Sequence, residues 1–143
     1  MNRGDIRRAQ VADAPAMARI VSDWEAATDW MPSIYGPEEI ADMIREAMPA
    51  REMWVVGDPI EGYLSFDPKV NRVGGLYCRK SGQGLGKALM DKAKEGRDFV
   101  WLTTHEPNLS AQKFYKREGF VEVSRNDAEP PETVREVRME WQR

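Results

Sequence analysis

The sequence contains only one cysteine and one histidine among its 143 residues. A disulfide framework needs pairs of cysteines, and a zinc site of the usual kind needs four cysteine or histidine ligands, so both are excluded. No apolar run reaches the roughly eighteen residues of a membrane-spanning helix. The first ten residues, MNRGDIRRAQ, also lack the apolar core of a signal peptide. We therefore expect a cytoplasmic protein with no metal and no membrane partner.

An excess of charge of either sign is also missing. The chain has 21 Lys and Arg residues against 24 Asp and Glu residues, a formal net charge of −3. This balance does not suit a nucleic-acid-binding domain, which carries a basic surface. Hydrophobic residues make up 41% of the chain and charged residues 31%, a composition typical of a soluble globular protein. The length and the lack of internal repeats predict a single domain over residues 1–143.

The spacing of apolar residues predicts an element order of β-α-α-β-β-β-α-β-α-β-β. Intervals of three and four residues favour four helices, which begin near Asp13, Pro37, Gly84 and Ser110. Apolar runs bounded by turn residues favour strands over residues 6–9, 54–56, 60–66, 73–78, 99–104, 120–124 and 137–141. Gly74 and Gly75 favour a bulge in the strand they interrupt. This order predicts an α+β fold with one mixed sheet and helices on its faces.

The segment 79–87, RKSGQGLGK, lies between a predicted strand and a predicted helix. Its three glycines allow a sharp turn and a close approach to a ligand. A helix that begins here offers unpaired N–H groups, and Lys80 and Lys87 add positive charge. The segment therefore predicts a phosphate site, with a purely structural turn as the alternative. A Walker loop and a dinucleotide-binding loop fit poorly, because Ser81 and Lys87 stand where those motifs require glycine.

A second segment, 108–120, reads NLSAQKFYKREGF and predicts a helix that Asn108 caps and Gly119 ends. Together the two segments resemble the GNAT superfamily of acetyl-CoA-dependent N-acetyltransferases. SGQGLG at 81–86 is similar to the family's Q/R-x-x-G-x-G/A motif, with Ser81 in place of Gln or Arg, and segment 108–120 is similar to a later family motif. The order of strands and helices also matches, so the resemblance covers nearly the whole chain.

The resemblance implies a GNAT-like acyl-CoA N-acyltransferase fold, an α+β (three-layer) architecture whose mixed sheet splays between its middle strands. Acetyl-CoA would be the cosubstrate, and its pantetheine arm would pair with backbone groups of Leu76, Tyr77 and Cys78. Its pyrophosphate would lie on the backbone amides of the glycine loop, which comprises Gly82, Gln83, Gly84, Leu85, Gly86 and Lys87. Asn108 would bind the pantetheine or the start of its own helix.

The reaction that the resemblance implies is direct attack of a neutral amine on the acetyl thioester in a ternary complex. A backbone N–H near Cys78 would face the developing oxyanion. Tyr115 matches the position from which family members protonate the leaving thiolate, with a buried structural tyrosine as the alternative. The strands 73–78 and 99–104 contain no Asp or Glu. The base therefore stays open among His105, Glu106, Asp67 and a water chain, and a surface residue is the other interpretation of His105.

The acceptor amine should bind near the loop 28–36, the second helix and the last hairpin. This part of the chain is rich in apolar and aromatic residues, which suit an amine with an apolar body or simply pack the loop: Trp24, Trp30, Met31 and Tyr35. Arg135 and Arg138 could steer a carboxylate, or be solvated surface residues.

Three functions fit the sequence. The first is an N-acetyltransferase that acts on a primary amine of a small molecule. The second is a protein or peptide acetyltransferase that modifies an N-terminus or a lysine, which an open groove in place of an aromatic pocket would favour. The third is a non-catalytic CoA-binding sensor of the same fold, against which the presence of Tyr115 and Asn108 argues. The charged stretch 130–143 permits a homodimer without arguing for one.

Overall fold

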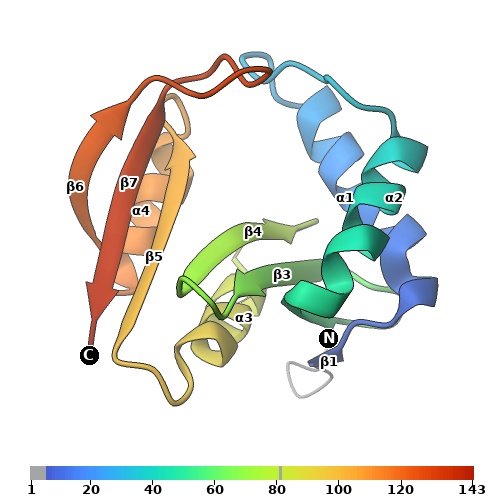
Figure 1. The fold of residues 1–143 in the computed structure, drawn as a ribbon, viewed down its shortest axis with the longest axis horizontal. Helices are drawn as coiled ribbons and strands as arrows, with labels where there is room; N and C mark the ends of the chain where they lie inside the picture. Colours follow the sequence, from blue (N-terminus) through green and yellow to red (C-terminus); the bar gives the residue numbers. More distant parts are fainter. Residues whose placement is uncertain (1–5, 81) are drawn as a thin grey trace.

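Seven strands form one mixed sheet in the order β1-β2-β3-β4-β5-β7-β6, in a computed structural model that describes residues 6–80 and 82–143 (Figure 1). The strands are β1 Arg7–Arg8, β2 Glu52–Val56, β3 Gly62–Asp67, β4 Arg72–Cys78, β5 Phe99–His105, β6 Val121–Asn126 and β7 Glu136–Gln142. The helices are α1 Ala14–Ala26, α2 Pro37–Ala47, α3 Leu85–Lys94 and α4 Leu109–Arg117. The predicted element order and the α+β class are both confirmed.

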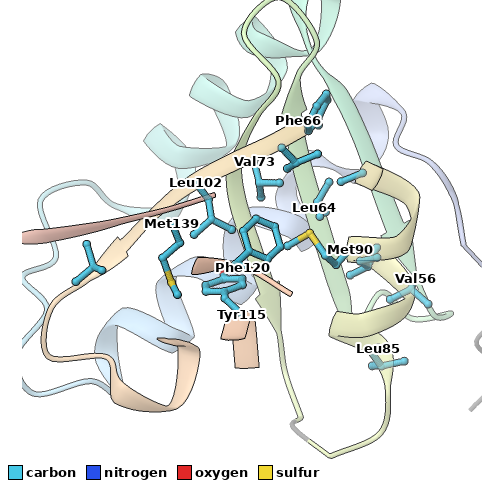
Figure 2. Close-up of a cluster of buried hydrophobic side chains, with 14 residues drawn as sticks. Val56, Leu64, Phe66, Val73, Leu85, Met90, Leu102, Tyr115, Phe120 and Met139 are labelled. Atoms are coloured by element: carbon cyan, nitrogen blue, oxygen red, sulfur yellow. The ribbon is translucent and has the colours of Figure 1, made fainter. Parts of the chain in front are cut away.

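Two layers of helices cover the sheet, one on each face. The alternation of side chains along the strands sends Val55 and Tyr63 toward α1 and α2, and Val56 and Leu64 toward α3. The cluster on the α3 and α4 face draws on both halves of the sheet and on both of these helices (Figure 2). Its largest fully enclosed side chains include Phe66, Leu64, Leu85, Leu89, Met90, Leu102 and Met139. This shared core joins the N-terminal strands to the C-terminal strands.

The start of α1 shows how a short strand is tied to a helix. Asp13 occupies the N-cap position, but its carboxylate makes no capping hydrogen bond to the helix. Instead its two oxygens accept hydrogen bonds from the Arg7 guanidinium at 2.8 and 2.9 Å, and one also accepts from the backbone N–H of Gln10 at 2.7 Å. Arg7 belongs to β1, so this ion pair fixes β1 against the beginning of α1.

The sheet opens between β4 and β5, as the sequence predicts. These parallel strands pair only at Arg72 with Trp101 and at Val73 with Leu102, whereas β5 pairs with β7 along its whole length. The β3–β4 register skips Gly74, because Ser65 pairs with Gly75 and Phe66 with Val73. The predicted bulge is therefore present at Gly74, directly after the last residue that pairs with β5. Figure 1 shows β4 and β5 diverging from this point.

Trp101 of β5 lies beside the two paired positions and contacts residues at the start of β4 and on β7. Its indole Nε1 donates a hydrogen bond to the carbonyl of Val70, just before β4, at 2.8 Å. The guanidinium carbons of Arg72 and Arg138 lie 4.9 and 3.9 Å from its ring centroid. These contacts hold β4 and β5 together where the two paired positions end.

Candidate active site

One cavity of about 1350 Å³ follows the opening between β4 and β5. Its lining includes the predicted cofactor-binding residues and the predicted acid: Leu76, Tyr77, Cys78, Gly82, Gln83, Gly84, Leu85, Gly86, Lys87, Asn108 and Tyr115. Of the candidate bases, His105 and Asp67 line the cavity and Glu106 does not. Parts of α1, α2 and the loop between them line the opposite side. The fold thus brings the glycine loop, segment 108–120 and the aromatic N-terminal segment around one space.

The glycine loop leads directly into α3. Gly82 and Gly84 have positive φ values of 77° and 75°, a conformation that side chains with a Cβ rarely adopt. Gly84 is the N-cap of α3, and its carbonyl accepts the first helical hydrogen bond from Ala88 at 3.1 Å. The N–H groups of residues 85–87 therefore have no partner within the helix. They point out of its N-terminus, where they can bind an anion. Ser81, the first residue of the motif, lies outside the described residues.

Gly86 and Lys87 also join α3 to α4. A Cβ at Gly86 would lie 3.2 Å from Cζ of Phe114, so glycine there lets the two helices approach closely. The ammonium of Lys87 lies 3.4 Å from Asp91 and 3.5 Å from Glu118 of the α4 end. The contacts between α3 and α4 therefore give Gly86 and Lys87 a structural role, in addition to any contact with a ligand.

Asn108 caps α4. Its side-chain oxygen accepts hydrogen bonds from the backbone N–H of Ala111 at 3.1 Å and from the Ser110 hydroxyl at 3.2 Å. Of the two predicted roles for Asn108, the structure contains the contact to the start of its own helix. Sequence reasoning missed Gln112, whose buried amide donates to the carbonyls of His105 and Glu106 and fixes α4 to the end of β5.

Tyr115 and Cys78 lie on the α3 and α4 side of the opening. Tyr115 is 8% exposed, packs edge-on against Phe120 and lines the cavity. Burial, with smaller contributions from Tyr77 and Cys78, raises the pKa of Tyr115 well above its usual value. Burial also raises the pKa of the Cys78 thiol to about 11. At neutral pH the phenol therefore keeps a proton to donate, and the thiol is a poor nucleophile.

The α1 side of the opening carries a cluster of rings, here called the aromatic wall: Trp24, Trp30, Tyr77 and His105. Trp24, Tyr77 and His105 line the cavity, whereas Trp30 contacts Trp24 and His105 without lining it. The His105 ring stacks on Trp24 with 5.9 Å between centroids and lies 5.4 Å from Trp30, while Trp24 meets Tyr77 edge-on at 5.6 Å. The interpretation of His105 as a surface residue is therefore wrong. Burial lowers the pKa of His105, against the opposing charges of Glu136 and Glu132, so the ring is neutral at pH 7.

The other two predicted bases already have cationic partners. Asp67 lies 3.4 Å from the Arg51 guanidinium and accepts the backbone N–H of Lys69 at 3.0 Å. Glu106 lies 3.4 Å from both Arg125 and Arg135. Neither carboxylate is placed to take a proton from an amine without giving up an ion pair.

The arginines predicted to steer a carboxylate are also engaged. Arg135 pairs with Glu106 and lies 3.3 Å from Asp127. Arg138 pairs with Glu140 at 3.0 Å and covers the Trp101 ring. Their charge is matched by neighbouring carboxylates, which fits the solvated-surface interpretation better than a steering role.

Sequence reasoning missed Glu25, which lines the cavity next to the aromatic wall. Its Oε1 atom is enclosed and has no hydrogen-bond partner among the described residues. Burial raises the pKa of Glu25, and the charge of Glu132 adds to this effect. A signal was present in the sequence, because Glu25 follows Val21 by four residues and so falls on the apolar stripe of α1.

Comparisons with known proteins agree with this geometry. Residues 49–122, a little over half of the chain, match the family model of the acetyltransferase (GNAT) domain, and this stretch contains the glycine loop and segment 108–120. Among curated proteins, no sequence matches the chain. Within the described residues, no helix is long and apolar enough to cross a membrane, and no His, Cys, Asp and Glu side chains are grouped to hold a metal ion.

Solved structures share the fold across almost the whole chain. YjaB from Escherichia coli, in its apo form, superposes with a TM-score of 0.76 at 21% identity over 95% of both chains. The yncA protein from Salmonella typhimurium, solved with its cofactor acetyl-CoA, gives 0.71 at 19% identity over 96% of this chain and 92% of its own. Ribosomal-protein-alanine N-acetyltransferase from Brucella melitensis gives 0.72 at 18% identity over 96% and 99%. The fold is that of the GNAT acetyltransferases. With the family-model match, the chain belongs to the GNAT acetyltransferase family.

Proposed function

We propose that this protein is a cytoplasmic N-acetyltransferase that transfers the acetyl group of acetyl-CoA to the primary amine of a small molecule. The observation that carries the proposal is the divergence of β4 from β5 after Val73, beside the N-terminus of α3. An extended ligand can pair with an open strand edge through main-chain hydrogen bonds. The same fold in yncA was solved with acetyl-CoA as its cofactor.

The backbone direction of β4 supports this pairing. The N–H of Arg79 donates to the carbonyl of Glu61 on the β3 side at 2.8 Å. Because successive residues of a strand alternate in direction, the N–H groups of Leu76 and Cys78 point away from β3 and toward the opening. These are the groups that a pantetheine arm would meet, and the Cys78 N–H is placed to stabilise an oxyanion.

The other end of the cavity suits phosphate groups. The free N–H groups at the start of α3 point into it. Three further cations line the cavity on the glycine loop and on α4, namely Lys80, Lys113 and Arg117. Lys113 and Arg117 are four residues apart and so lie on one face of α4. This arrangement of donors and charges fits the pyrophosphate and phosphate groups of coenzyme A.

When bound, the acetyl thioester supplies the acyl group that the acceptor amine attacks. The protonated hydroxyl of Tyr115 donates a proton to the leaving sulfur, since burial holds its pKa above neutral pH. Transfer is direct, because the Cys78 thiol has a pKa of about 11 and is not ionised enough to carry the acyl group.

The aromatic lining of the acceptor side favours a small molecule over a protein. The connection between β6 and β7 runs toward α1 and α2 along one edge of the molecule (Figure 1). Glu132 in this connection is close enough to raise the pKa of Glu25 on α1. The aromatic wall contributes Trp24, Tyr77 and His105 to the lining of the same cavity. A protein substrate would need an open groove in this position.

The first experiment is thermal unfolding with and without acetyl-CoA, for the wild type and for Gly84→Glu. At a hundred times its Kd, the ligand should stabilise the wild type by about 2.7 kcal/mol, a shift of several degrees at this size. Gly84→Glu should lose the shift, since the new side chain fills the loop. Gly96→Glu is the matched control, because Gly96 has the same left-handed backbone (φ 74°) at the opposite end of α3. It should keep the shift.

Thiol release with a set of amines then separates enzyme from sensor. Release that depends on an amine supports the proposed transfer. Binding of acetyl-CoA without release for any amine indicates the CoA-binding sensor instead. No shift of the wild type with acetyl-CoA would overturn the proposal as a whole.

A further inference from the structure

Glu25 lines the acceptor half of the cavity, and its side chain is partly buried there. Its Oε1 atom is enclosed and accepts no hydrogen bond from any of the described residues. An ionised carboxylate removed from water is destabilising unless a cation or hydrogen-bond donors compensate. The charge of Glu25 acts on Tyr63 and Tyr77, which places it beside the aromatic wall. The cation of a bound ligand could therefore serve as the partner that the enclosed oxygen lacks.

The aromatic wall is a surface that attracts cations. Trp24 and Trp30 contact the His105 ring, and Trp24 also contacts Trp30 and Tyr77, with centroid separations between 5.4 and 5.9 Å. An ammonium group is attracted to the electron-rich faces of such rings, and more strongly where water is excluded. His105 does not oppose this attraction, because burial keeps its ring neutral at pH 7.

The charged groups on this side of the cavity leave a negative excess. Glu132 and Glu136 add to the field of Glu25, as their effects on His105 indicate. Two arginines line this side. Arg51 pairs with Asp67. Arg72 covers the Trp101 ring and donates to the Thr103 hydroxyl, which in turn donates to Glu136, while the Arg72 Nε has no hydrogen-bond partner among the described residues. Beside the aromatic wall, a carboxylate on the acceptor would meet the negative charges of Glu25, Glu132 and Glu136.

The remaining lining of this side is apolar. Ile34 and Met43 are 38% and 47% exposed and face the cavity together with Tyr35. Exposed apolar side chains in a concave site gain free energy when a ligand covers them. An alkyl or aryl body fits here, with its charged end toward Glu25.

We propose that Glu25 and the aromatic wall bind the ammonium group of the acceptor, and that the acceptor is an alkylamine or arylalkylamine without a carboxylate beside its amine. Glu25 is then the residue that selects amines over the corresponding amino acids. The role of the ligand as an acceptor rests on the proposed acetyl transfer. The cation site is argued from the positions of Glu25 and the aromatic wall alone.

The kinetic test compares phenethylamine with phenylalanine, which differ by one carboxylate on the carbon next to the amine. In the wild type, kcat/KM for phenethylamine should exceed that for phenylalanine by at least about tenfold, the effect of one charge-assisted hydrogen bond. Glu25→Gln keeps the shape of the side chain and removes its charge. It should raise KM for phenethylamine by about tenfold to a hundredfold while KM for acetyl-CoA stays unchanged. Glu38→Gln, on the exposed first turn of α2, is the matched control and should behave as the wild type.

A binding test works without acetyl transfer. Trp24 and Trp30 report on the wall through tryptophan fluorescence, excited where phenyl rings do not absorb. Phenethylamine should give a saturable change in the wild type that Glu25→Gln weakens about tenfold or more, and phenylalanine should give little change. Equal binding of the two ligands, or equal binding by the wild type and Glu25→Gln, overturns the inference.

The two tests separate failure of the inference from failure of the proposed function. Acetyl transfer that shows no preference between the two ligands overturns the cation site and leaves the transferase function standing. Selective binding of phenethylamine without any acetyl transfer supports the cation site and counts against the transferase function.

Discussion

Tyr115 combines a packing role with a chemical role, and one substitution separates them. Tyr115→Phe keeps the ring that packs against Phe114 and Phe120 and removes only the hydroxyl. We expect kcat to fall by about a hundredfold or more, in the range of general acid catalysis, while the acetyl-CoA-induced shift in Tm is retained. Steady-state kinetics and thermal unfolding measure the two effects. A variant with the kcat of the wild type would show that the proton comes from another group.

His105 gives the stability of the protein a defined dependence on pH. Its folded-state pKa is lowered from 6.5 by burial, so between the two values the unfolded chain binds more protons than the folded chain. The stabilising contribution of neutral His105 is therefore complete above about pH 6.5 and is lost as the pH falls toward the folded pKa. Urea unfolding from pH 8 to pH 5 should show a steeper decline for the wild type than for His105→Gln. Parallel curves would contradict this assignment.

Single residues mark where sequence reasoning succeeds and where it stops. Gly84 and Tyr115 fall in motifs with fixed spacing, so their places beside one cavity could be predicted. The apolar stripe of α1 indicates only that Glu25 faces inward. What surrounds Glu25 and His105 could not be predicted, because their neighbours come from distant segments. Trp24 and Trp30 enclose His105, and the charge of Glu132 reaches Glu25 from the β6–β7 connection. A charged residue on a helix is most often solvated, and only the tertiary arrangement reveals the exception.

At the scale of elements, the start of α4 depends on a single cap. The Asn108 side chain accepts the N–H of Ala111, one of the free donors at the helix N-terminus. Asn108→Ala should lower the free energy of unfolding by about 0.5–2 kcal/mol. Ser110→Ala, which removes only a donor to Asn108, should cost less and serves as the control.

The same variant separates the two roles predicted for Asn108. If it acts only as a cap, the Kd for acetyl-CoA measured by calorimetry should stay close to that of the wild type. If it also contacts the pantetheine arm, the Kd should rise in Asn108→Ala and remain unchanged in Ser110→Ala.

The elements themselves could be predicted well, because apolar spacing and glycine positions record local structure directly. All four helices and the strand order along the chain are confirmed, and the bulge falls at Gly74. The differences are at the ends. β1 is shorter than the predicted strand over residues 6–9, β2 begins two residues earlier and β3 two residues later than predicted, and β6 begins one residue later and ends two residues later. Strand ends depend on the partner strand, which a single sequence does not contain. For the same reason the neighbours of β7, with β5 on one side and β6 on the other, come only from the structure.

At the scale of the whole molecule, two groups of strands meet at a short junction. The first comprises β1 to β4, and the second β5 to β7. They share two paired positions, the contacts of Trp101 with Val70 and Arg72, and the core on the α3 and α4 face. This architecture places the candidate site in the gap rather than on either group alone. A ligand in the opening would contact both groups, so its binding free energy adds to the stability of the folded state.

The open edge of β4 has a consequence for amide hydrogen exchange. Residues along this strand alternate in direction, so Leu76 and Cys78 direct their amide hydrogens into the opening, while Tyr77 directs its own toward β3. If coenzyme A pairs with this edge, the Leu76 and Cys78 amides should exchange more slowly in its presence, and the Tyr77 amide should change much less. This alternating pattern of protection would show that the ligand pairs with the edge of β4 as a neighbouring strand would.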